Sequence, residues 1–257
     1  MRDEEVTRDR GTQGLLAVFG MSKTYSGVRA VDDVSFRLEP GEVCALIGPN
    51  GAGKTTLLNL LSGHTRSDRG VVMLSGRRLS GIGPRQIWKF GVSRTFQVPA
   101  IFPSLTSSEH LELVYLSCAG RTVLASRASR SFARAAAGEL LARVGLRGAQ
   151  NRLAGGLTQS ERKRLEIAMA VANEPKVLLL DEPGAGLTQD ETRSLMQLVV
   201  HLVGGCATAV LFIEHNVTTV LAFAQRFISL REGRIVAQGP VASLGTAQRA
   251  QDSYLAG

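Results

Sequence analysis

One segment, GPNGAGKT at residues 48–55, narrows the possible folds of this chain more than any other. It fits the phosphate-loop pattern GxxxxGK[ST], which binds phosphate only between a strand and a helix. An apolar run, Val43–Ile47, precedes it and predicts a buried strand. Lys54–Leu61 follows and predicts a helix that ends before Gly63. A glycine-rich turn that matches by chance is disfavoured, because every fixed position and both flanks fit.

The chemistry of such a loop comes from its backbone as much as from its side chains. Glycines let successive N–H groups curve around a phosphate, and the helix N-terminus adds its positive dipole end. We expect Lys54 to reach the β- and γ-phosphates of a nucleotide and Thr55 to hold Mg²⁺. The predicted nucleotide contacts are Asn50, Gly51, Ala52, Gly53, Lys54, Thr55 and Thr56.

Two further apolar runs end in charged or titratable side chains. Lys176–Leu180 leads into Asp181 and Glu182, and Val210–Ile213 leads into Glu214 and His215. Ligands of open α/β sheets bind at the carboxyl ends of the strands. Asp181 therefore suits Mg²⁺ coordination, and Glu182 suits a general base acting on water. A capping role alone is the competing interpretation of this acidic pair.

Composition limits the remaining possibilities. The chain has 257 residues, 44% of them hydrophobic, which suffices for one large domain or two lobes. Three separated cysteines do not form a disulfide framework. The charged start predicts a flexible tail over residues 1–13 and no secretory signal. Residues 194–213 carry no formal charge, but glycines and polar residues interrupt them, so we expect a helix and then a strand.

The net charge of +8 is concentrated in one part of the chain. Residues 117–165 contain ten basic and two acidic residues, which is also +8. Arg127, Arg130 and Arg134 have helical spacing and would share one face. A solvated face and a contact with anionic lipid headgroups both remain possible for this stripe.

The order of the elements predicts an α/β fold. Strands that alternate with helices favour a parallel, RecA-like phosphate-loop core. The first third of the chain predicts an antiparallel β subdomain, including an exposed hairpin over Val71–Leu79. The helical block between the core strands predicts an inserted α-helical subdomain. We place the core and β subdomain at residues 14–98 and 166–257 of a single domain, 14–257, and the helical subdomain at 99–165.

These pieces occur in a diagnostic order. A phosphate loop at 48, a glutamine in GVSRTFQ at 97, a helix start at 157, a carboxylate strand at 181 and a histidine in FIEHN at 215 follow one another. Over about residues 14–240 this order resembles the ATP-binding subunit of ABC transporters. The long segments VDDVSFRLEPGEVCALIGPNGAGKTTLLNLLSG and KRLEIAMAVANEPKVLLLDEPGAGL resemble the branched-chain amino-acid uptake subfamily most.

The resemblance implies roles that the residues alone do not. Tyr25 would stack on adenine, Gln97 would sense Mg²⁺ and the attacking water, and His215 would contact the γ-phosphate. Asp181 would assist the metal and Glu182 would be the base. Two such subunits would close head to tail over two ATP molecules. The helix start of one subunit, at Thr158, Gln159, Ser160 and Glu161, would then cap the nucleotide bound by the other.

The helix start departs from the family pattern. Leu-Ser-Gly-Gly-Gln is usual, whereas this chain has Leu157-Thr158-Gln159-Ser160-Glu161. Larger side chains should hinder a phosphate from approaching the backbone, and Glu161 competes for the helix's positive end. Thr158 and Glu161 also fit a capping box, and residues 162–164 could offset the acid. A functional variant and a weakened motif both remain open. Thr188 is a second departure, since the family often has aspartate there.

The resemblance predicts an ATPase that powers an importer with ATP and Mg²⁺, for branched-chain amino acids or related small amides. The expected partners are membrane permease subunits, a second ATPase chain of related or identical sequence, and indirectly a substrate-binding protein. The expected place is the cytoplasmic face of the cell membrane, as a peripheral subunit. No nucleic-acid partner is expected. The alternatives are a non-transport ABC ATPase acting on nucleic acid or ribosomes, which the basic residues permit, and a monomeric phosphate-loop kinase.

Overall fold

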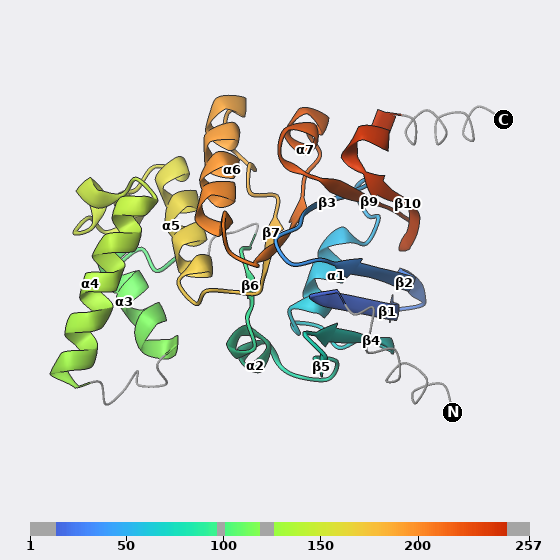
Figure 1. Ribbon diagram of the computed structural model, residues 1–257, viewed down its shortest axis with the longest axis horizontal. Coiled ribbons are helices and arrows are strands. Elements are labelled where there is room, and N and C mark those ends of the chain that lie inside the picture. The colour runs from blue at the N-terminus through green and yellow to red at the C-terminus, as the bar shows by residue number, and fades with distance from the viewer. Residues whose placement is uncertain (1–13, 97–100, 119–125, 246–257) are drawn as a thin grey trace.

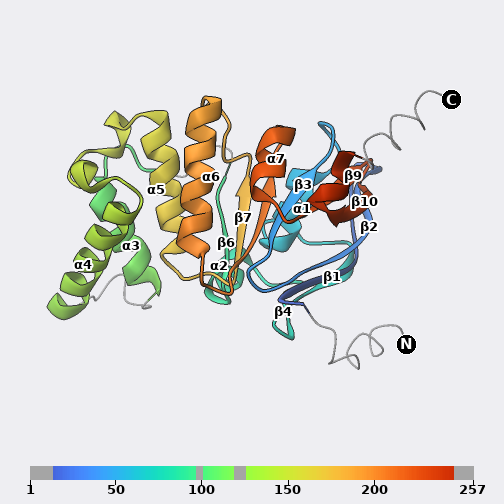
Figure 2. The same ribbon diagram turned by 45° about the horizontal axis from the view of Figure 1, so that its top comes forward.

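The computed structural model describes residues 14–96, 101–118 and 126–245. The predicted tail over residues 1–13 and Gln97 lie outside the described residues. Two sheets and a group of helices build the molecule, with the helices α3, α4 and α5 at the end opposite the β-rich part (Figures 1 and 2). The predicted combination of a parallel core, an antiparallel β region and inserted helices is confirmed.

The core sheet carries the phosphate loop and the acidic residues. Its order is β10-β9-β3-β8-β7-β6. The strands are β3 (Val43–Ile47), β6 (Val92–Arg94), β7 (Val177–Asp181), β8 (Ala209–Ile213), β9 (Arg226–Arg231) and β10 (Arg234–Pro240). All neighbours are parallel except β9 and β10, which pair antiparallel at one edge. Because β8 lies between β3 and β7, the residues that follow these three strands meet at one edge of the sheet.

The central strands are buried on both faces, as their continuous apolar sequences predict. Side chains alternate between two clusters. Val43 and Ala45 of β3 join the cluster that includes α5 (Gln159–Val171) and α6 (Gln189–Val203). Cys44 and Leu46 join the cluster that includes α1 (Lys54–Leu61) and the second sheet. The sheet is therefore the middle layer, with helices on one side and α1 and the second sheet on the other.

The second sheet is antiparallel, in the order β2-β1-β4-β5. It contains β1 (Leu16–Tyr25), β2 (Val28–Leu38), β4 (Arg69–Leu74) and β5 (Arg77–Arg78), and α2 (Pro84–Lys89) follows it. The prediction of an exposed hairpin over Val71–Leu79 is wrong in one respect. Val72, Leu74 and Leu79 are buried, because alternate residues of β4 face the core cluster around α1.

The helices α3 (Ser107–Cys118) and α4 (Arg127–Arg143) pack on each other and on α5. Ala133 and Ala137 let α4 approach its neighbours closely, and Leu140 and Leu141 complete its buried face. Arg127, Arg130 and Arg134 are exposed on α4. Arg134 pairs with Glu112 of α3 at 3.4 Å, so one member of the basic stripe has an acidic neighbour.

Residues 194–213 fold as predicted. The helix α6 ends at Val203, and β8 begins at Ala209. Among the described residues, no helix has the length and hydropathy needed to cross a bilayer. Helix α7 (Val217–Phe223) follows β8, and the side chain of Asn216 caps its N-terminus.

Candidate functional site

The phosphate loop joins β3 to α1 and depends on glycine at two positions. Gly48 and Gly53 have φ of 146° and 99°. A Cβ at Gly48 would lie 2.1 Å from the Leu230 carbonyl oxygen, and one at Gly53 would lie 2.1 Å from the Ala30 carbonyl oxygen. Both contacts are shorter than any side chain tolerates. The loop is thus pressed between β9 and β2, and only glycine permits this path.

The N-terminus of α1 leaves donors available in the loop. The first hydrogen bond of the helix runs from Leu57 N to Gly53 O, at 2.9 Å. Gly53 caps the helix without a side-chain hydrogen bond from the described residues. The N–H groups at residues 54–56 come before that first bond, so they are the unpaired donors of a helix start. Asn50, Gly51 and Thr55 are exposed at the loop's rim. These donors can therefore meet an anion.

Lys54 is buried within the phosphate loop. Its ammonium donates to the Gly48 and Pro49 carbonyl oxygens, at 2.8 and 2.9 Å. Burial lowers the pKa of Lys54, and the nearby negative charges of Glu182 and Asp181 act in the opposite direction. The cation therefore lies inside its own loop, with both acidic residues near enough to influence its pKa.

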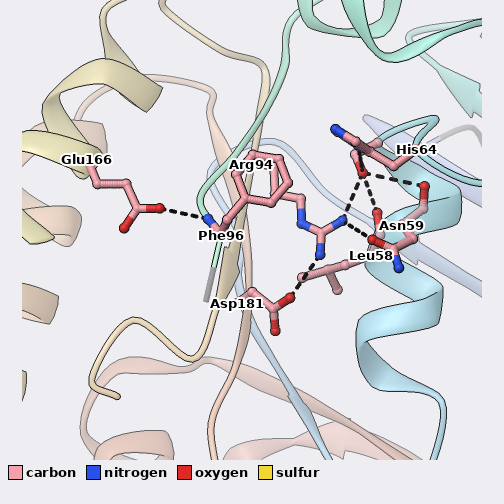
Figure 3. A network of polar contacts seen from close by, with 8 residues as sticks. Leu58, Asn59, His64, Arg94, Phe96, Glu166 and Asp181 are labelled. Atoms are coloured by element: carbon pink, nitrogen blue, oxygen red, sulfur yellow. Dashed lines mark hydrogen bonds and ion pairs between the residues drawn. The ribbon is translucent and has the colours of Figure 1, made fainter. Parts of the chain in front are cut away.

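Asp181 ends β7 and is 2% exposed. Its Oδ2 accepts a hydrogen bond from Arg94 Nη2 at 2.8 Å, and both side chains are almost fully buried. Arg94 Nη1 donates to Asn59 Oδ1 at 2.6 Å and to Ser62 Oγ at 3.1 Å. Figure 3 shows the guanidinium between Asp181 and the helix that carries Asn59. The sequence analysis did not identify Arg94, because its partners are distant in the chain.

The end of β6 also contacts α5. Glu166 Oε1 accepts a hydrogen bond from the Phe96 backbone N–H at 2.7 Å (Figure 3). Glu166 is buried beside Lys163, 3.7 Å away. Burial raises the pKa of Glu166, although the Phe96 N–H and the Lys163 charge oppose that shift. The buried carboxyl group of Glu166 on α5 thus holds the backbone two residues after Arg94.

Glu182 and His215 come together as neighbours of the phosphate loop. His215 Nε2 lies 2.8 Å from Glu182 Oε1. Both side chains are partly exposed, which leaves them accessible to water or a nucleotide. Glu182 has φ of 48°, a left-handed conformation that is uncommon for non-glycine residues. The structure therefore places the predicted base and the predicted phosphate-contacting histidine within one hydrogen bond.

Tyr25 lies at the end of β1 and is 44% exposed. Its hydroxyl is 3.4 Å from Thr65 Oγ1, and the Lys23 ammonium lies 5.3 Å from its ring centre. An exposed ring is available for stacking, and its role toward adenine stays a prediction. Gln97 lies outside the described residues, so its predicted metal contact also stays a prediction.

The helix start at residues 158–161 has the predicted capping box. Thr158 Oγ1 accepts from Glu161 N at 3.2 Å, and Glu161 Oε2 accepts from Thr158 N at 2.8 Å. The prediction that residues 162–164 offset Glu161 is wrong. Arg152 pairs with it at 2.8 Å, and the Thr158 N–H and Arg152 lower its pKa. Ser160 is partly buried on the first turn.

Gln159 contacts the loop that follows the acidic pair. Its Nε2 lies 3.2 Å from the Ala185 carbonyl oxygen. A Cβ on Gly186 would lie 2.0 Å from the same nitrogen. Thr188, the second departure from the family pattern, caps α6 with a capping box of its own, through Glu191. Both departures therefore have a local structural role.

Known proteins share the sequence segments that form this site. The family model described as ABC transporter matches residues 31–185, which is more than half of the chain. The chain belongs to the ABC transporter family. The match spans the phosphate loop, the helix start at 158 and the acidic pair, whereas Tyr25 and His215 lie outside it.

Curated relatives of this family cover nearly the whole chain. The high-affinity branched-chain amino acid transport ATP-binding protein LivG of Salmonella typhimurium is 38% identical over 236 residues, 89% of this chain and 92% of its own length. The corresponding protein BraF of Pseudomonas aeruginosa is 34% identical, over 88% and 91%. A crystal structure of an ATP-binding cassette of an ABC transporter, in its ADP conformation, has a TM-score of 0.81 at 27% identity, covering 95% and 99%.

The side chains at this ABC site fit a nucleotide with Mg²⁺. The loop offers a buried cation and helix N–H groups, which suit a phosphate tail. Thr55 at the start of α1 and Asp181 at the end of β7 offer oxygen donors, which Mg²⁺ prefers. Two protein oxygens are few, but Mg²⁺ commonly completes its shell with phosphate oxygens and water.

Proposed function

We propose that this chain is the ATP-binding and hydrolysing subunit of an importer for branched-chain amino acids or related small amides. As a member of the ABC family the chain is an ATPase. The names of its relatives support the amino-acid substrate. The observation that carries the proposal is the Lys54 ammonium held inside the phosphate loop by the Gly48 and Pro49 carbonyl oxygens, at 2.8 and 2.9 Å, at the sheet edge where β7 ends in Asp181.

Residues of the phosphate loop and the end of β7 would bind the phosphates and Mg²⁺. Asn50, Gly51, Ala52, Gly53 and Thr56 would cradle the phosphate tail with their backbone, and Lys54 would neutralise the β- and γ-phosphates. Thr55 and Asp181 would hold Mg²⁺, which supplies charge neutralisation of the phosphates, and Gln97 would join them. The contacts of the Lys54 ammonium support its assignment, and that of Gln97 rests on the family resemblance alone.

Glu182 would take a proton from the attacking water. Its carboxylate is partly exposed. It accepts a hydrogen bond from His215 in the tautomer that carries a proton on Nε2. His215 would then orient the carboxylate or contact the γ-phosphate. Catalysis of this kind is mainly positioning and electrostatic stabilisation of the phosphoryl group. Tyr25 would stack on the adenine ring from the end of β1.

Two subunits would close head to tail, each presenting residues 158–161 to the partner's nucleotide. The capping box occupies Thr158 and Glu161 in the described structure, and Arg152 balances the acid. These contacts favour a helix start that is stable without glycines. A related but different ATPase chain is the proposed partner, with a second copy as the alternative.

A cavity between α2, α3 and α5 suits a segment of the membrane permease. Its volume is about 460 Å³, and apolar side chains such as Trp88, Phe102 and Leu113 line it. Phe102 and Leu113 are exposed, 62% and 46%. Exposed apolar side chains around a concavity are typical of an interaction site. We place the permease here and the chain at the cytoplasmic membrane face.

The first experiment tests nucleotide binding. A fluorescent ATP analogue should bind the wild-type chain in the presence of Mg²⁺, and Lys54→Ala should abolish binding while the folded circular dichroism spectrum remains. Binding that survives in Lys54→Ala would contradict the proposed site. Amino-acid uptake in cells that lack the chain should return with the wild-type protein and not with this variant.

The second experiment tests the permease surface. Leu113→Glu places a charge at the cavity, and we expect it to abolish co-purification with the membrane subunits. Val200→Glu is the matched control, because Val200 is 37% exposed on α6, away from the cavity. Equal loss in both variants, or in neither, would contradict the assignment of this surface.

A further inference from the structure

A buried arginine bridges the two elements that carry the proposed Mg²⁺ donors. Arg94 Nη2 binds Asp181 Oδ2 of β7 at 2.8 Å. Arg94 Nη1 binds Asn59 of α1 and Ser62, the residue that caps the C-terminus of α1, at 2.6 and 3.1 Å. Thr55 lies on the same helix, one turn before Asn59, and its position follows from that of α1. The guanidinium therefore connects the Thr55 helix to the Asp181 strand (Figure 3).

The geometry points to Arg94 as a positioning residue that fixes Asp181 relative to Thr55 for Mg²⁺. This inference rests on the proposed ATPase function and assigns Arg94 a role that the family resemblance did not supply. Only one carboxylate oxygen of Asp181 is bound by the guanidinium. The other oxygen is left to act toward the metal or its water, in an orientation set by the Arg94 contact.

The chemistry of arginine suits this bridge. A guanidinium is planar and permanently charged, and its fixed donors can serve several acceptors at once. Lysine has one ammonium at the end of a flexible chain and cannot reproduce the three contacts. The side chains of Arg94 and Asp181 are only 4% and 3% exposed, so water cannot easily replace a lost contact. Partners behind a metal ligand of this kind typically change metal affinity about 10–100-fold when removed.

The bridge also reaches the helical part of the molecule. Two residues after Arg94, the Phe96 N–H is held by Glu166 of α5. Arg94, Phe96 and Glu166 all line the cavity proposed for the permease. A segment bound in that cavity would contact the residues that position Asp181. The network thus gives a physical connection between the partner surface and the metal site.

A Mg²⁺ titration tests the inference. A fluorescent ATP analogue binds the full chain in EDTA, and Mg²⁺ is then added until binding is saturated. We expect the half-saturating Mg²⁺ concentration to rise about 10–100-fold in both Arg94→Gln and Arg94→Lys. Asn59→Ala, which removes one α1 contact, should raise it less. Arg193→Gln should behave as wild type, because Arg193 is exposed on α6 and takes no part in the bridge or in the cavity lining.

The two Arg94 variants distinguish a positioning role of this side chain from an effect of its positive charge alone. If Arg94 acted only as a cation that repels Mg²⁺, Arg94→Gln would lower the half-saturating concentration and Arg94→Lys would leave it unchanged. That result, or an unchanged value in both variants, would overturn the inference. If circular dichroism shows that Arg94→Gln does not fold, the half-saturating Mg²⁺ concentrations of Arg94→Lys and Asn59→Ala test the inference instead. A wild-type chain whose ATP binding ignores Mg²⁺ would instead overturn the proposed function.

Discussion

Alanine at Gly53 should cost much more stability than alanine at Gly51, although both glycines lie in the phosphate loop. Both have positive φ, 99° and 79°. A Cβ at Gly51 would meet nothing within 4 Å, whereas one at Gly53 would lie 2.1 Å from the Ala30 carbonyl oxygen. The two variants share the backbone strain of a positive φ, about 1–3 kcal/mol each. Their difference isolates the steric contact with β2.

The contact leaves little freedom to relax. The Gly233 N–H donates to the Ala52 carbonyl oxygen at 3.0 Å, and the Asp32 N–H donates to the Gly233 carbonyl oxygen at 2.8 Å. These bonds tie the loop to the β9–β10 turn and to β2. Overpacking of a well-packed site typically costs about 1–3 kcal/mol. We expect Gly53→Ala to exceed Gly51→Ala by that amount.

Equilibrium unfolding in urea, followed by circular dichroism, measures both free energies. The binding of a fluorescent ATP analogue to each variant gives a second measure, and Gly53→Ala should lose more affinity because the loop must move away from β2. Unfolding free energies that agree within about 0.5 kcal/mol, near the size of ordinary surface effects, would refute the steric account.

Three further predictions concern single side chains of the site. Glu182→Gln should retain ATP binding and slow hydrolysis about 10²–10⁴-fold, the usual contribution of a general base; hydrolysis at the wild-type rate in a phosphate-release assay would exclude that role. Burial raises the pKa of Glu166 above its ordinary 4.5, so the folded state binds this proton more tightly than the unfolded state, and stability should fall as pH rises from about 4.5 to the raised value. Unfolding free energies measured across that range should show a flatter pH dependence in Glu166→Gln. Thr158→Ala and Ser126→Ala each remove a helix cap and should each cost about 0.5–2 kcal/mol, but only Thr158→Ala should also slow ATP turnover.

The local patterns of the sequence predicted most of the fold. Val43–Ile47 and Lys54–Leu61 have the predicted bounds, because a continuous apolar run and a glycine-bounded helix are specified by neighbouring residues. The capping box at Thr158 was also predictable, since its two partners are three residues apart. The hairpin over Val71–Leu79 forms, but its predicted exposure was wrong, because burial of one face depends on a distant cluster.

The side-chain network of the site could not be predicted in the same way. Arg94 contacts residues 35 and 87 positions away, and Glu166 contacts a backbone N–H 70 positions away. Nothing in the segment around Arg94 indicates these partners before the strands are placed side by side. The ion pair between Glu161 and Arg152 was not predicted for a related reason. Residues 162–164 project around the helix from Glu161, while Arg152 approaches from the preceding loop.

The two positions that depart from the family pattern, Thr158 and Thr188, both form capping boxes. Thr158 and Thr188 each cap a helix and are each bonded back by a glutamate three residues later. Gln159 joins the two regions by contacting the carbonyl oxygen of Ala185. Local stability thus accounts for these residues without a partner subunit, so stability alone cannot reveal a role at the partner's nucleotide. The comparison of Thr158 with Ser126 separates the two effects, because both are helix caps and only Thr158 belongs to the segment proposed to meet that nucleotide. Equal ATP turnover in the two variants would assign residues 158–161 a structural role only.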